Sequence, residues 1–143
     1  MQFEVVDLRP WHLEKLIVLP PAGPVTMETL ERSYFSEGSA AYCLLSKDDP
    51  VFAGGIVNLQ WHRGEIWMTP NLFFHRHVKT CFKLMKNMLP GFVARGHFKR
   101  VQLVCSGKVP EGLFLHLGFE YEGTLKSFGP AGEECRMYAR VFN

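Results

Sequence analysis

The segment 113–142, LFLHLGFEYEGTLKSFGPAGEECRMYARVF, decides most of what the sequence indicates about the fold. Pro110 suits the start of a short helix that carries Leu113, Phe114 and Leu117, and Gly118 is typical of a helix end. Two runs with aromatic residues follow, at 119–128 and 134–142. Because they flank the turn sequence GPAGE, they predict a terminal β-hairpin.

A strand–helix–strand unit precedes this segment, over 65–106. EIWMTPNLF (65–73) is expected to form a strand, in which Pro70 marks a bulge or a splayed end. From 78 to 92, apolar residues recur every 3.6 residues while lysines share another face, which indicates a helix. KRVQLVCS (99–106) is a second strand. The unit therefore predicts a parallel pair of strands.

The amino-terminal part supplies the other strands, expected at 3–8, 40–46 and 51–62. In the last of these, Gly54 and Gly55 suggest a bulge or close packing, and RG (63–64) is expected to form the following turn. Pro10 suits a first helical position, and Thr26 can cap a second helix that ends near Gly38. The predicted fold class is α/β (α+β), with a mixed, mostly antiparallel sheet of about seven strands and about four helices in one domain, 1–143.

Composition narrows the classes of function. A chain of 143 residues with 47% hydrophobic and 21% charged residues is typical of a soluble globular domain. The net charge of +2 does not favour nucleic acid as the main partner. No apolar run approaches the roughly 20 residues of a membrane span, and MQFEVVDLRP is neither a signal nor a transit peptide. We expect a cytoplasmic protein that binds neither nucleic acid nor a membrane; a homodimer stays open.

Cysteine and histidine spacing gives little support to a metal site. The four cysteines are widely spaced, form no C-x-x-C pair, and are expected to be reduced and mostly buried: Cys43, Cys81, Cys105 and Cys135. His75 and His77 lie close together, but the spacing supplies no third ligand, so we expect no metal. The tryptophans are expected in the core and in groove walls: Trp11, Trp61 and Trp67.

The whole order of elements, and the closing segment above all, resembles the GNAT superfamily of N-acetyltransferases. The segment 113–142 is similar to the end of that family: a short helix, Leu-Gly-Phe, an acid-Gly step and a hairpin with an aromatic-rich last strand. It is most similar to the branch that acetylates protein N-termini and small amines. The resemblance implies a GNAT-like fold with a splayed parallel pair. It also implies an acetyl-CoA-dependent transfer of acetyl to a primary amine, by direct attack.

The same resemblance implies a cofactor site. Acetyl-CoA would lie between the splayed strands, with its pantetheine arm on backbone near Thr69, Asn71 and Leu72. Its pyrophosphate would lie on amides at the start of the next helix, in a motif written Q/R-x-x-G-x-G/A. On this chain the motif falls on six consecutive residues: Arg76, His77, Val78, Lys79, Thr80 and Cys81.

Two positions of this motif depart from the family. Lys79 stands in place of the first glycine and Cys81 in place of the closing glycine or alanine, whereas Arg76 matches. Glycine lets a phosphate approach the backbone closely, so Lys79 could crowd the anion. Alternatively, the charges of Lys79, Arg76 and His77 could replace that close approach. A third reading is a solvated basic helix start without a ligand.

Amine acetylation needs a base, a donor for the oxyanion and an acid for the leaving thiolate. Glu65 begins the strand that would line the acetyl group, where the resemblance implies a base; the alternative is a surface carboxylate beside a turn. His62 ends the neighbouring strand, and histidine is a residue type that suits a base, although an exposed hairpin histidine is the other reading. Glu65 and His62 are therefore the candidate catalytic residues.

The acid is harder to assign. The tyrosine that the family uses, in the helix before Leu-Gly-Phe, is replaced by Phe114, and no asparagine occurs in SGKVPEG (106–112). Tyr121 and Tyr138 are near in chain order and are expected to pack in the hairpin. Cys105 could act as a nucleophile, but an inert buried thiol fits its apolar neighbours better.

These departures support a rival hypothesis. A GNAT-fold protein without robust catalysis could serve as a binding or assembly module, as some compact GNAT-like proteins of tailed bacteriophages do. The sequence thus leaves two alternatives, an N-acetyltransferase and a catalytically degenerate module.

Overall fold

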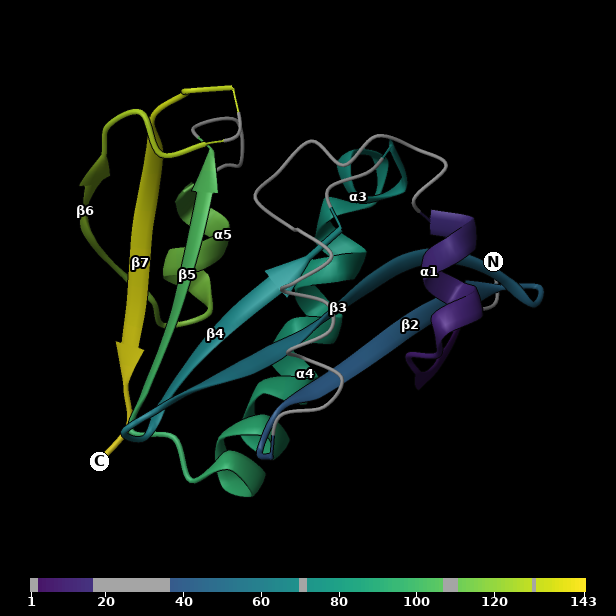
Figure 1. Ribbon diagram of the computed structural model, residues 1–143, viewed down its shortest axis with the longest axis horizontal. Helices are drawn as coiled ribbons and strands as arrows, with labels where there is room; N and C mark the ends of the chain where they lie inside the picture. The colour runs from purple at the N-terminus through teal and green to yellow at the C-terminus, as the bar shows by residue number, and fades with distance from the viewer. Residues whose placement is uncertain (1–2, 17–36, 70–71, 107–110, 130) are drawn as a thin grey trace.

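A computed structural model of the chain describes residues 3–16, 37–69, 72–106, 111–129 and 131–143 (Figure 1). The strands in this part are β1 (Phe3–Asp7), β2 (Ala40–Ser46), β3 (Asp49–Gln60), β4 (Arg63–Met68), β5 (Arg100–Ser106), β6 (Glu120–Leu125) and β7 (Cys135–Val141). The helices are α1 (Pro10–Leu16), α3 (Leu72–Arg76), α4 (Val78–Gly96) and α5 (Glu111–His116). Most of the helix predicted from Thr26, and also Asn71, lie outside the described residues.

The strands form one seven-stranded sheet in the order β1-β2-β3-β4-β5-β7-β6. Every neighbouring pair is antiparallel except β4–β5, which is parallel. The terminal hairpin therefore enters the sheet with β7 between β5 and β6. The mixed sheet, its central parallel pair and the hairpin confirm the fold class predicted from the sequence.

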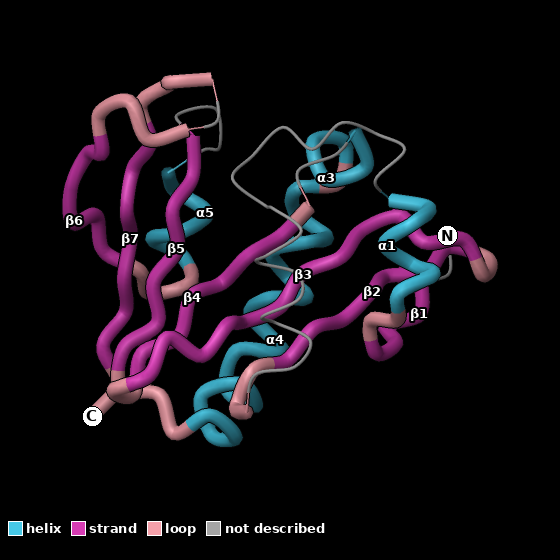
Figure 2. The backbone as a smooth tube through the Cα atoms, in the orientation of Figure 1, coloured by secondary structure: helices cyan, strands magenta, loops and turns pink. Residues whose placement is uncertain are grey.

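Parallel pairing is short, and the two strands then diverge. The Cα partners begin at Arg63 and Arg100 and end at Glu65 and Gln102. Both strands continue beyond this last pair, and their carboxyl ends point to different parts of the molecule (Figures 1 and 2). The parallel pair is therefore splayed, as expected.

Two hydrophobic clusters lie on the two faces of the sheet. On one face, α4 and α5 pack against the sheet, and the cluster contains Phe82 of α4, Phe114 of α5 and Tyr138 of β7. On the other face α1 covers the first strands, with Leu16 packed near Trp67 of β4 (Figure 1). Because strand side chains alternate between faces, Ile66 and Met68 join the α4 cluster while Trp67 joins the α1 cluster.

The glycine pair of β3 reflects close packing. A Cβ on Gly55 would lie 2.1 Å from the carbonyl oxygen of Ala40 in β2. The register shifts of these strands occur elsewhere, at Leu44/Leu45 and at Asn58/Gln60. Of the two predicted reasons for the glycines, a bulge or close packing, the structure shows the second.

The boundaries of β4 differ from the sequence prediction at both ends. The turn before it consists of residues 61–62, which have positive φ like Gln60 at the end of β3, so Arg63 and Gly64 belong to the strand and not to the turn. β4 ends at Met68 instead of 73, and Leu72 begins the short helix α3. Pro70 cannot donate to a strand ladder, which gives a physical reason for the early end.

The tryptophan prediction holds for one residue of three. Trp67 is buried, whereas Trp61 is 82% exposed at the β3–β4 turn and Trp11 is 46% exposed on α1. The prediction of mostly buried thiols is confirmed, since Cys43, Cys81 and Cys135 are buried and all four cysteines are free. Among the described residues, no helix is both long and apolar enough to cross a bilayer.

Candidate active site

The opening between β4 and β5 is the first feature of the candidate site. Pairing ends at Glu65 and Gln102, yet β4 continues to Met68 and β5 continues to Ser106. Over this length β4 has no strand partner on its β5 side among the described residues. Unpaired strand edges present N–H and C=O groups that can bond to an extended ligand.

Thr69 is bonded to the other edge of β4. Its N–H donates to the carbonyl oxygen of Ala53 at 2.8 Å. Its hydroxyl accepts from the Ala53 N–H at 3.0 Å and donates to the Ala53 oxygen at 3.2 Å. Because the groups of successive residues face alternate edges of a strand, Met68 presents its backbone groups to the opening. Met68 is therefore better placed than Thr69 to bond an extended ligand, which the sequence did not indicate.

The start of α4 lies close after this edge along the chain. His77 is the N-cap residue, and its N–H donates back to Phe73 of α3 at 2.9 Å. The first bond of the α4 ladder is the Cys81 N–H to the His77 oxygen, at 3.0 Å. The amides of Val78, Lys79 and Thr80 precede that bond. Such leading amides carry the partial positive charge of a helix N-terminus.

Basic side chains surround this helix start. Arg76 and Lys79 are exposed, and neither forms an ion pair with a described residue. His77 is half-buried, with its ring stacked on Phe73 at 4.4 Å between centroids. The first turn of α4 contains no acid. The helix start thus combines backbone donors with side-chain positive charge, an arrangement that suits an anion.

Two other predicted cofactor residues occupy different positions. Leu72 lies on α3 with an exposed side chain and not on a strand edge. Cys81 is fully buried in the core under the sheet, and burial raises the pKa of its thiol to about 12. The Cys81 side chain therefore packs in the core as a neutral thiol. No group of three or more metal-ligating side chains occurs among the described residues.

Glu65 sits at the last paired position of β4, half-buried, on the α1 face that it shares with Trp67. The Gln102 amide donates to its Oε1 at 3.4 Å, and the Gln102 oxygen accepts from Arg100 Nε at 3.1 Å. Arg100 in turn bonds both carboxylate oxygens of Glu122, at 2.9 and 2.5 Å. This polar row crosses from β4 to β6 on one face. Sequence reasoning missed Gln102, Arg100 and Glu122, because their proximity depends on strand order.

His62 lies at the opposite end of β4. It is exposed in the β3–β4 turn, and its Nδ1 is 3.1 Å from the carbonyl oxygen of His97. Its own carbonyl accepts from the N–H of Lys99 at 2.7 Å. At about 3.3 Å per strand residue, His62 is roughly 10 Å before Glu65. The structure therefore does not bring His62 to the opening.

An aromatic cluster fills the α5 side of the splayed strands. Phe114 is 1% exposed, with its ring 5.2 Å from Phe82 of α4 and 4.9 Å from Tyr138 of β7. Cys105 of β5 is half-buried, and burial raises its thiol pKa to about 11. A thiol with so high a pKa is protonated at neutral pH, which favours the inert alternative for Cys105.

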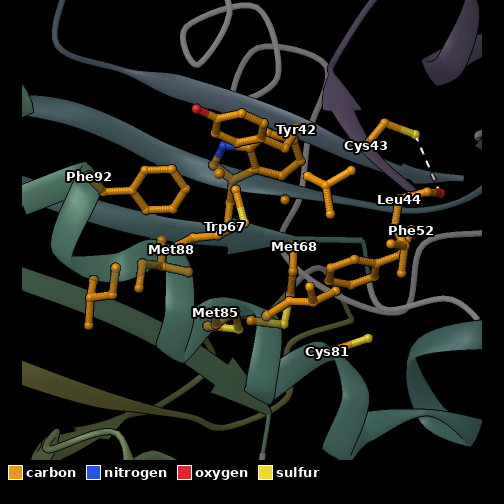
Figure 3. Close-up of a pocket in the computed structure, with 16 residues that line it drawn as sticks. Tyr42, Cys43, Leu44, Phe52, Trp67, Met68, Cys81, Met85, Met88 and Phe92 are labelled. Carbon is orange, nitrogen blue, oxygen red and sulfur yellow. Dashed lines mark hydrogen bonds between the residues drawn. The ribbon is translucent and has the colours of Figure 1, made fainter. Parts of the chain in front are cut away.

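An apolar cavity extends from the end of β4 beneath the sheet (Figure 3). It occupies about 540 Å³ including its open mouth, and Gly54 contributes no side chain there. Met68 and Cys81 lie toward one side of it, and Phe92 and Tyr42 toward the other (Figure 3). None of the described residues that line this cavity is charged. The opening thus has polar backbone groups along the edge of β4 and an apolar cavity beneath the sheet.

Comparison with known proteins shows which fold this is. No family model and no curated protein sequence matches the chain. Among solved structures, Ard1 of Thermoplasma volcanium matches with a TM-score of 0.78 at 11% identity, over 100% of this chain and 99% of that one. The ribosomal-protein-S18-alanine N-acetyltransferase of Escherichia coli matches with a TM-score of 0.75 at 11% identity, over 98% and 94%.

RimL, a ribosomal-protein α-N-acetyltransferase in complex with coenzyme A, also matches, with a TM-score of 0.75 at 12% identity over 99% and 95% of the two chains. This chain has the GNAT fold. At these identities the matches establish the fold alone. The resemblance drawn from residues 113–142 is therefore confirmed for the fold. The splayed parallel pair that it implied is present as β4 and β5.

Proposed function

We propose that this GNAT-fold protein is an acetyl-CoA-dependent N-acetyltransferase that acetylates a primary amine, on a small molecule or a protein N-terminus. One observation carries the proposal. The unpaired edge of β4 beyond Glu65 is followed along the chain by a basic helix start that holds no acid. An extended amide-containing arm and a pyrophosphate are the two parts of coenzyme A that would use this pair of features.

In the proposed complex, the backbone of Met68 bonds the pantetheine arm. The leading amides of α4, with Arg76 and Lys79, hold the pyrophosphate. Neither side chain has an ion-pair partner among the described residues, so both charges are available to an anion. Lys79 then supplies charge where a glycine would supply close approach. RimL in complex with coenzyme A is a GNAT-fold precedent for the cofactor.

Glu65 is the proposed base. It lies on the α1 face at the point where the strands separate, so an amine can approach it from that face. The carboxylate takes a proton from the ammonium, and the free amine attacks the thioester carbonyl directly. Gln102 donates to the Glu65 carboxylate and restricts its orientation. His62 lies next to the end of β4 that is paired with β5, and it has no role in the proposed reaction.

The rival function is a GNAT-fold binding or assembly module, for example in a bacteriophage virion. Phe114 favours it, because that side chain cannot donate a proton, and Lys79 and Cys81 alter the phosphate motif. Under either function we propose a single domain over 1–143. The four free thiols fit a cytoplasmic location.

Titration with acetyl-CoA, monitored by calorimetry and by thermal denaturation, distinguishes the acetyltransferase from the binding or assembly module. A ligand of the native state stabilises it by RT ln(1 + [L]/Kd), about 2.7 kcal/mol at a hundredfold excess over Kd. We expect stabilisation, and release of free thiol when an amine panel of polyamines and short peptides is added. Millimolar acetyl-CoA without any stabilisation would exclude the acetyltransferase. Binding without thiol release from any amine would favour the module.

A further inference from the structure

Tyr138 is fully buried, and its hydroxyl has no hydrogen-bond partner among the described residues. A buried hydroxyl without a partner costs free energy, so such groups are rare, and a catalytic role is one of the reasons for which they are kept. The ring lies 4.9 Å from Phe114, between centroids, and 5.8 Å from Tyr121. Tyr138 therefore places an unused proton donor inside the aromatic cluster.

Tyr138 lies on the strand next to β5, close to the point where β4 and β5 separate. Tyr138 pairs with Leu103 of β5, and Leu103 directly follows Gln102, the last residue of β5 that pairs with β4. Adjacent strands lie about 4.8 Å apart, so the β7 backbone is one strand away from the opening. Tyr138 and Leu103 belong to the same cluster on the α4 and α5 face.

Two electrostatic neighbours of Tyr138, Arg136 and Cys105, lie toward the open end. Arg136 has its guanidinium carbon 5.9 Å from the Tyr138 ring, and it pairs with Cys105, two residues beyond Leu103. Cys105 and Glu111 at the start of α5 also act on the hydroxyl. Burial is the main cause of its raised pKa; Arg136 opposes it, and Glu111, Cys105 and Tyr121 add to it. The hydroxyl therefore keeps its proton at neutral pH.

We propose that the Tyr138 hydroxyl donates the proton that the leaving thiolate needs, the task that Phe114 cannot perform. The inference rests on the proposed acetyltransferase function. The indole N–H of Trp67 is also buried without a described partner, but it is a hydrogen-bond donor that does not give up its proton.

Glu65 takes a proton from the ammonium, and the amine nitrogen forms a bond to the acetyl carbonyl carbon. The carbon–sulfur bond breaks, and its electron pair stays on sulfur. Sulfur receives the Tyr138 proton and leaves as the coenzyme thiol. Solvent then returns a proton to the Tyr138 oxygen, and Glu65 releases its own.

The test compares Tyr138→Phe with Tyr121→Phe on two donors, acetyl-CoA and its selenoester analogue, in single-turnover assays with one amine. The selenolate is a weaker base than the thiolate and leaves without a proton. Tyr138→Phe should slow transfer from acetyl-CoA about 100-fold and transfer from the selenoester far less. Tyr121 is 49% exposed and bonded to Thr124, so Tyr121→Phe should change neither rate.

A purely structural role predicts other outcomes. If Tyr138 only packs, Tyr138→Phe should leave both rates unchanged or lower both equally, and either result overturns the proposal. Thermal denaturation gives a second readout: removal of an unpartnered buried hydroxyl should leave the melting temperature unchanged or raise it. A fall in melting temperature would indicate a hydrogen bond that the proposal excludes.

The double variant Phe114→Tyr/Tyr138→Phe returns a hydroxyl to the adjacent ring. It should recover part of the acetyl-CoA rate, and no recovery in a folded protein counts against the proton-donor role. The assays distinguish failure of the proton-donor role from failure of the proposed function. If the wild-type protein transfers acetyl to no amine, both the acetyltransferase function and the role of Tyr138 are rejected. If the wild-type protein is active and Tyr138→Phe has the same rate, only the role of Tyr138 is rejected.

Discussion

Glu65 and Gln102 are the last partners of the parallel pair, and the Gln102 amide donates to the Glu65 carboxylate at 3.4 Å. The carboxylate is thus held at the point where β4 and β5 separate. Its charge lies on the α1 face, with Ile66 and Met68 of β4 on the other face. In the proposed reaction, the amine therefore approaches Glu65 from the α1 face, and the thioester lies in the opening between β4 and β5.

Glu65→Gln keeps the size of the side chain and removes the base. We expect kcat for acetyl transfer to fall about 100-fold, because the amine then depends on solvent for deprotonation. Stabilisation by acetyl-CoA should be unchanged, since Glu65 does not bind the cofactor. Glu4→Gln, an exposed change on β1, is the control and should be silent. Unchanged turnover in Glu65→Gln would remove Glu65 from the mechanism.

Arg76→Ala tests the anion site at the start of α4. Loss of one charged contact should raise the Kd for coenzyme A about tenfold, as measured by calorimetry. An equal loss with dephospho-CoA would assign Arg76 to the pyrophosphate, and a loss seen with coenzyme A alone would assign it to the 3′-phosphate. Lys83→Ala, an exposed site on the same helix, should change Kd by less than about twofold. Equal effects of both variants would indicate general charge and no defined site.

Gly55→Ala tests the close approach of β2 and β3. The new Cβ would lie 2.1 Å from the Ala40 oxygen and 2.9 Å from the Ala41 Cα, which are backbone atoms. Overpacking of this kind should lower the free energy of unfolding by about 3 kcal/mol, measured by denaturant titration. Gly112→Ala in α5 meets no atom within 4 Å and should instead stabilise by about 0.5 kcal/mol. Similar stability of the two variants would contradict the packing.

The Arg100–Glu122 pair should give a pH-dependent contribution. Hydrogen bonding to Arg100 lowers the pKa of Glu122 in the folded protein. A lowered folded pKa stabilises the protein above the unfolded-state pKa, and this contribution disappears as the pH falls through the folded value. Glu122→Gln should therefore lower stability at neutral pH, by under about 1 kcal/mol because the pair is partly exposed, and have no effect in strong acid.

Melting temperatures at neutral and acidic pH measure this difference, with the exposed Glu120→Gln of the same strand as control. An effect of Glu122→Gln that is equal at both pH values would show that the ion pair is not its source.

Local sequence patterns predicted the strands and the long helix well, and β2 has the predicted boundaries, 40–46. They failed at Leu72 and Phe73, where a short apolar run fits a strand or a helix equally and α3 formed instead of more strand. They also placed His62 beside Glu65, because adjacent strand ends look close in a sequence. The hairpin turn puts His62 at the far end of β4 from the opening.

The sequence by itself determined the order of elements, the terminal hairpin and the basic, glycine-free helix start at Arg76 and Lys79. These follow from periodicity and residue type over short stretches of chain. Only the tertiary structure decided that Thr69 bonds to Ala53 and leaves the opening to Met68. It also decided that Tyr138 lies buried beside Phe114, with no hydrogen-bond partner for its hydroxyl in the part of the chain that is described. Those facts depend on which strands become neighbours, since hydrogen-bond partners far apart in the chain fix which groups remain unpaired.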